Sequence, residues 1–62
     1  LQYSEALVMA MRKVRAAFKL YLDLASKTPN DEIQLVFRSL ANEEAKHKRG
    51  FEIEYNESLL LC

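Results

Sequence analysis

The spacing of apolar residues in the first half of the chain limits its fold more than any other feature. These residues recur at alternating intervals of four and three, and the whole sequence contains only one glycine and one proline. Such spacing places apolar side chains along one face of an α-helix that packs in a bundle. We therefore predict a long helix over about residues 5–26, with Ser4 as its N-cap. Its apolar stripe consists of Leu7, Met11, Val14, Phe18, Tyr21 and Ala25.

A turn over residues 27–30 is expected to end this helix. Pro29 cannot donate a helical hydrogen bond and disfavours helical geometry at Thr28. A second helix is predicted over about residues 31–60, with Asn30 as its N-cap and Thr28 as the alternative cap. The stripe of this second helix consists of Ile33, Phe37, Leu40, Glu44, His47, Phe51 and then Glu54 or Tyr55.

A turn this short makes the two helices antiparallel. The predicted fold class is therefore all-α, and residues 1–62 form a single two-helix hairpin. Pairing Ala25 with Ile33 fixes a register in which the numbers of facing residues sum to about 58. The predicted layers are Ala25 with Ile33, Tyr21 with Phe37, Phe18 with Leu40, Val14 with Glu44, Met11 with His47, Leu7 with Phe51, and Tyr3 with Tyr55.

The apolar surface of this hairpin is larger than two helices can bury against each other. A chain of 62 residues also forms only a marginal core without a disulfide, a metal or a partner. We therefore expect a four-helix bundle formed by a homodimer, or a larger homo-oligomer. The residues that broaden the apolar face are Ala10, Ala17, Leu20, Leu24, Val36 and Ala41.

Charge and composition argue against several other partners. Nine Lys and Arg balance nine Asp and Glu, so we expect neither nucleic acid nor an anionic membrane as a partner. We also expect no membrane span, because no apolar stretch approaches the necessary length, and no signal peptide, because the N-terminus lacks a basic and then apolar layout. Cys62 is the only cysteine, which favours a reducing compartment and hence a cytoplasmic protein.

The pattern Glu44-Ala45-Lys46-His47 is the candidate for chemistry. A carboxylate and an imidazole three residues apart lie on one helix face, as they do in carboxylate-bridged metal sites. A carboxylate on an apolar seam is costly to bury without a partner, and a metal ion meets that need. A structural alternative remains open, in which Glu44 and His47 bond each other or water inside the bundle.

The runs at residues 17–25 and 31–47 resemble a rubrerythrin-type ferritin-like repeat. The resemblance implies hairpins that pair into four-helix bundles around two irons or similar metals. It also implies reactions with peroxide or oxygen, or iron handling, and thus a di-iron oxidoreductase if the chain is an enzyme. Glu44 and His47 match the two ligands that this family takes from its second helix.

Val14 departs from that family pattern. The resemblance implies a ligand glutamate seven residues before the tyrosine that matches Tyr21, and this position is Val14. A homodimer then offers two Glu and two His, which suit ferrous iron or zinc, with manganese as a further alternative. A second hypothesis is a metal-free helical assembly domain that has lost the site.

Two other features have more than one interpretation. Gly50 interrupts the second helix one turn after His47, where it allows either close helix approach or a local bulge. The basic residues Lys46, Lys48 and Arg49 are interpreted as a solvated face, because glutamates surround them.

Overall fold

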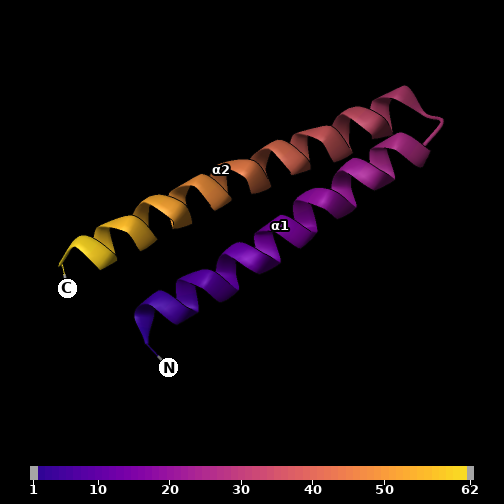
Figure 1. Cartoon of the computed structure of the whole chain (residues 1–62). Coiled ribbons are helices and arrows are strands. Elements are labelled where there is room, and N and C mark those ends of the chain that lie inside the picture. The colour runs from indigo at the N-terminus through magenta and orange to yellow at the C-terminus, as the bar shows by residue number, and fades with distance from the viewer. Residues whose placement is uncertain (1, 62) are drawn as a thin grey trace.

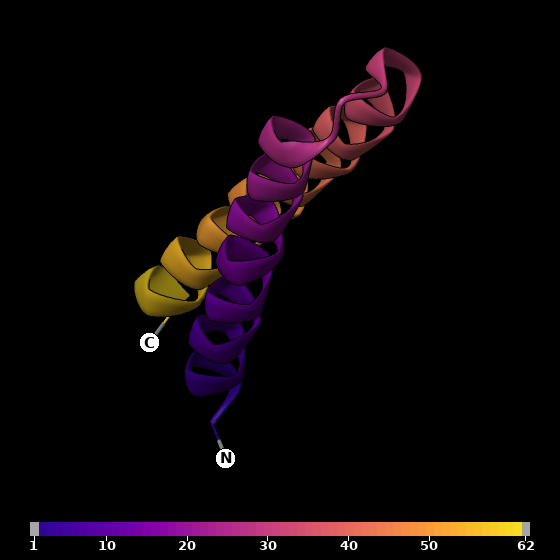
Figure 2. The same ribbon diagram turned by 90° about the vertical axis from the view of Figure 1, so that its right-hand side faces the viewer.

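The computed structural model describes residues 2–61 as two long helices joined by a short turn. Helix α1 spans Tyr3–Lys27 and helix α2 spans Asp31–Leu61. The helices lie side by side and antiparallel, with both chain ends at one end of a 49 × 17 × 11 Å rod (Figure 1). A view from a perpendicular direction shows the same pairing (Figure 2). The prediction of an all-α antiparallel hairpin is therefore confirmed, and the described residues contain no strand.

Helix α1 begins one residue before the predicted cap. Gln2 is the N-cap, without a side-chain hydrogen bond, and its carbonyl accepts the amide of Ala6 at 3.0 Å. The prediction of Ser4 as N-cap is therefore wrong, because Ser4 already lies inside the helix. The added residue Tyr3 donates a hydrogen bond from its hydroxyl to Glu54 Oε2 on α2, at 2.7 Å. This contact joins the first turn of α1 to α2.

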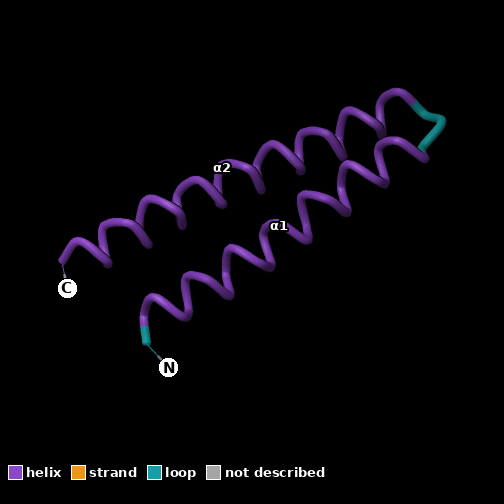
Figure 3. The backbone as a smooth tube through the Cα atoms, in the orientation of Figure 1, coloured by secondary structure: helices purple, strands orange, loops and turns teal. Residues whose placement is uncertain are grey.

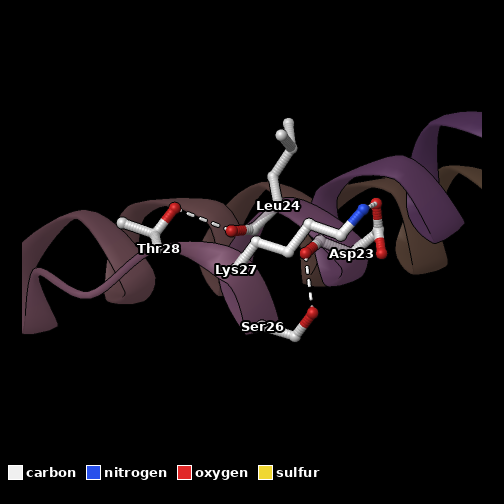
Figure 4. Close-up of polar contacts among 5 residues, drawn as sticks. All are labelled: Asp23, Leu24, Ser26, Lys27 and Thr28. Carbon is white, nitrogen blue, oxygen red and sulfur yellow. Dashed lines mark hydrogen bonds and ion pairs between the residues drawn. The ribbon is translucent and has the colours of Figure 1, made fainter.

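Side chains satisfy backbone groups at the C-terminal end of α1 (Figure 4). The Thr28 hydroxyl donates to the Leu24 carbonyl and the Ser26 hydroxyl donates to the Asp23 carbonyl, each at 2.7 Å. The Leu24 carbonyl lies in the last turn, where carbonyls lack intrahelical partners, so the bond from Thr28 stabilises the helix end. Lys27 Nζ lies 2.9 Å from Asp23 Oδ2, and its positive charge suits the end of the helix dipole.

Asn30 begins α2 as predicted. Its Oδ1 accepts the Ile33 amide at 3.0 Å, and its carbonyl accepts the Gln34 amide at 2.9 Å. Thr28, the alternative cap, instead directs its hydroxyl to the Leu24 carbonyl of α1. The Thr28 backbone carbonyl accepts a hydrogen bond from Gln34 Nε2 at 2.6 Å. These bonds fix the short loop that joins the helices (Figure 3).

An aromatic contact between the helices follows the predicted register. The rings of Tyr21 and Phe37 stack with centroids 6.5 Å apart and an interplanar angle of 21°. This pair is one of the predicted layers and confirms the register in the half of the hairpin nearest the turn. Among the described residues, the buried apolar side chains are few: Leu7, Val14, Ala25 and Ala41.

The stripe of α2 that packs on α1 differs from the predicted one. Ile33 and Leu40 are 45% and 39% exposed, and His47 is also exposed, so their predicted places in the buried seam are wrong for the single hairpin. One partner helix covers only a narrow stripe, and these three residues lie along its edge at intervals of seven. The side chains of α2 that are buried or half-buried are Gln34, Phe37, Ala41, Glu44, Lys48, Phe51, Tyr55 and Ser58.

Candidate metal site

Glu44 and His47 lie one turn apart in the middle of α2, and their side chains converge. Glu44 Oε1 is 3.7 Å from His47 Nδ1. This separation exceeds a hydrogen bond, so the structural alternative of a direct Glu44–His47 bond is not formed here. Zinc binds carboxylate oxygen and imidazole nitrogen at about 2.0–2.2 Å, so two donors at this separation can share one ion. The donor pair therefore fits a metal of this class.

The two side chains differ in their exposure to solvent. Glu44 retains 22% of its side-chain exposure, whereas His47 retains 58%. Glu44 thus lies at the border of the seam, and His47 lies outside it. Among the residues with described side chains, no fully buried polar atom lacks a hydrogen-bond partner. The Glu44 carboxylate therefore keeps contact with solvent, and the hairpin alone does not force a partner on it.

Val14 is the apolar residue of α1 at the level of Glu44. Val14 is 9% exposed. It lies two turns before Tyr21, and Glu44 lies two turns after Phe37, so the stacking of Tyr21 on Phe37 places Val14 and Glu44 at the same level of the antiparallel hairpin. No hydrocarbon side chain can bind a metal, so α1 adds no ligand from this position. Within the described part of the chain, no three metal-ligating side chains gather at one point. A single hairpin therefore brings together only the two predicted ligands.

His47 belongs to an uncovered face of α2, which we call the open face: Ile33, Val36, Leu40 and His47. These residues follow one another at helical intervals, and the three apolar ones are 39–56% exposed. A contiguous apolar surface of this kind is typical of a contact site rather than of free surface. The candidate ligands thus border a face suited to a further layer of helices.

Glu54 is engaged with α1 and does not join the Glu44–His47 pair. Its Oε2 accepts the Tyr3 hydroxyl at 2.7 Å, and this bond raises the pKa of Tyr3 above its ordinary value, with smaller contributions from desolvation and nearby negative charge. The predicted layer of Tyr3 with Tyr55 was one residue from this pairing. The predicted register therefore indicates which part of α2 Tyr3 contacts.

Neither helix, over the residues described, contains a segment apolar and long enough to cross a lipid bilayer.

A comparison with protein-family models places the chain among known proteins. The Rubrerythrin model matches residues 4–58, a segment that includes both helices, the turn and the Glu44-x-x-His47 pattern. Comparison with curated proteins and with solved structures gives no significant match. Because the family match covers most of the 62 residues, it agrees with the helical hairpin and with the resemblance drawn from residues 17–25 and 31–47. The chain therefore belongs to the rubrerythrin family, whose fold is ferritin-like.

Proposed function

We propose that the chain is a metal-binding module that works as a homodimer, with Glu44 and His47 of each copy as ligands. Two copies provide two carboxylates and two imidazoles, a set that suits ferrous iron or zinc. Membership of the rubrerythrin family favours iron over zinc and manganese. It also favours a role in oxidative-stress or iron-handling chemistry.

The observation that carries this proposal is the convergence of Glu44 and His47. Their donor atoms lie 3.7 Å apart without a hydrogen bond between them, on a continuous helix that fixes their spacing. Two donors alone bind a metal weakly, so further ligands are needed. Because His47 lies on the open face, a partner that covers this face can supply them.

A second copy of the chain is the partner that we propose for the open face. The apolar residues of this face, Ile33, Val36 and Leu40, lie on the same stripe as His47, and Glu43 and Glu44 occupy the turn between Leu40 and His47. A two-fold symmetric contact uses the same surface from both copies, so each copy buries its open face and contributes the same two ligands. One interface then accounts for both the exposed apolar residues and the incomplete ligand set.

Metal analysis of protein purified without a histidine tag tests the proposal. The wild type is expected to bind ferrous iron under anaerobic conditions, and Glu44→Ala/His47→Ala is expected to bind none. The matched control is Glu43→Ala/Lys46→Ala, which removes an exposed pair with a 3.3 Å contact from the same turns of α2. The control should keep its metal. Retention of the metal by the Glu44/His47 variant would show that the ligands are assigned wrongly.

The pH dependence of metal binding provides a second test of His47 as a ligand. Imidazole binds metals only in its neutral form, so iron affinity should fall as the solution is made acidic. The measurement is an iron titration at several pH values, with His47→Gln as the comparison. An affinity that does not change between neutral and mildly acidic pH would argue against an imidazole ligand.

A metal-free assembly domain is the second candidate function, and Val14 is the observation that favours it. This residue fills the level of Glu44 with a buried aliphatic side chain where the family pattern implies a carboxylate. In that case the dimer forms equally well with or without iron, and Glu44→Ala/His47→Ala leaves its association unchanged.

A further inference from the structure

A groove between α1 and α2 brings together basic residues that are far apart in the sequence. Its volume is about 330 Å³, and four of its lining residues are Arg15, Lys19, Lys48 and Arg49. We call these four residues and the space between them the basic groove. Neither Glu44 nor His47 lines it, so it is separate from the candidate metal site.

The cations of the basic groove form none of the ion pairs found among the described side chains. Among the residues with described side chains, lysines such as Lys27 and Lys46 form ion pairs on the helix surfaces, but none of the four groove cations lies within 4.0 Å of a carboxylate. Glu52 also lines the groove and leaves an excess of three positive charges there. In a chain with no net charge, this concentration of one sign is a local feature and not a consequence of composition.

The clustered cations repel one another when no anion is present. Arg15 and Lys19 are one turn apart on α1, and like charges at this spacing repel each other. Lys48 and Arg49 add two further charges from α2. An anion in the groove converts this repulsion into attraction to four charges at once.

The chemistry of the groove favours a phosphate group. Arg15 and Arg49 carry planar guanidinium groups, which bind phosphate oxygens in pairs, and the two lysines add further charge. Phe18 provides an apolar surface in the same groove. The volume lies at the lower end of the range for small-molecule sites, and the groove covers only a few turns of the helices. We propose that the basic groove binds the phosphate group of a small molecule that also has an apolar part.

Calorimetric titration with phenyl phosphate at low salt tests this proposal. The test variant is Arg15→Gln/Arg49→Gln, which removes two exposed cations and no core residue. The matched control is Arg12→Gln/Lys46→Gln, which makes the same change in charge outside the groove. We expect the test variant to weaken binding by at least about tenfold, and the control to change it by less than about twofold. Circular dichroism checks that both variants keep their helices.

Further titrations distinguish the source of the phosphate group. Inorganic phosphate should bind more weakly than phenyl phosphate, because it lacks a part that contacts Phe18. Vesicles containing phosphatidic acid should bind no better than vesicles of phosphatidylcholine alone. Equal weakening by the test and control variants would overturn the proposal, because binding would then follow total charge. Binding to phosphatidic acid vesicles without binding to phenyl phosphate would overturn it in favour of a membrane surface.

Discussion

A glutamate in place of Val14 would add a carboxylate to α1 at the level of Glu44. The resemblance of residues 17–25 and 31–47 implies a carboxylate at this position, and the register set by Tyr21 and Phe37 brings Val14 level with Glu44. In the proposed dimer the change adds two carboxylates to two Glu and two His. The resulting set of six is the kind that holds two metal ions in ferritin-like bundles.

The structure sets the expected size of the effect without metal. Val14 is 9% exposed, so the substitution removes packed aliphatic volume and buries a negative charge close to Glu44. We expect a loss of about 2 to 4 kcal/mol in the free energy of unfolding. Ferrous iron at about 100 times its dissociation constant stabilises the folded state by about 2.7 kcal/mol. Iron should therefore offset most or all of the loss in Val14→Glu.

The assay compares thermal midpoints and bound iron for the wild type and Val14→Glu, with and without ferrous iron under anaerobic conditions. Val8→Glu is the matched control, because Val8 is a half-buried valine of α1 nearer the N-terminus. The control should be destabilised by a similar or smaller amount and should gain no iron. If Val14→Glu is equally destabilised in both conditions and binds no additional iron, Val14 does not face the site and the proposed register fails.

Three further predictions concern the hairpin itself. Gly50→Ala should raise the free energy of unfolding by about 1 kcal/mol, because the added methyl meets open space in a continuous helix. Denaturant titrations measure this change, and a loss of stability would contradict the prediction. Asn30→Ala should lower it by about 1 kcal/mol, since the Ile33 amide loses its acceptor, and an unchanged midpoint would argue against the cap. Tyr3→Phe should remove the tyrosine with the raised pKa from a spectrophotometric pH titration. Because the pKa of Tyr3 is raised in the folded state, its hydrogen bond to Glu54 stabilises the hairpin below about pH 10 and is lost as the pH rises through the raised value.

The fold could be predicted because its main signals are local. The spacing of apolar residues predicts α1 without reference to residues distant in the sequence. Pro29 and Asn30 mark the turn and the start of α2. The short turn then restricts the register enough to predict the stacking of Tyr21 on Phe37. Cap chemistry alone points to Ser4, whereas α1 begins at Tyr3, whose hydroxyl bonds Glu54 across the hairpin.

The exposure of part of the α2 stripe could not be predicted from periodicity. An apolar pattern shows which residues are suited to burial, but it does not say which neighbour buries them. Ile33, Leu40 and His47 fit the pattern and are still exposed in the hairpin. Gly50 lies in a continuous helix with open space around it, so neither a bulge nor a close approach within the hairpin explains it.

The basic groove depends on the fold and not on neighbours in sequence. In the sequence, glutamates surround the basic residues of α2. Arg15 and Lys19 reach Lys48 and Arg49 only through the antiparallel pairing of the helices. A search for like charges across the predicted register would have found this cluster before the structure was known.

Sedimentation equilibrium of the wild type with and without ferrous iron tests the central proposal most directly, because the metal site is proposed to form between two copies. The proposal predicts a dimer whose dissociation constant falls when iron is added under anaerobic conditions. It also predicts that Glu44→Ala/His47→Ala abolishes this effect of iron, whereas Glu43→Ala/Lys46→Ala does not. A stable, folded monomer at micromolar concentration that binds iron without associating would contradict the proposal.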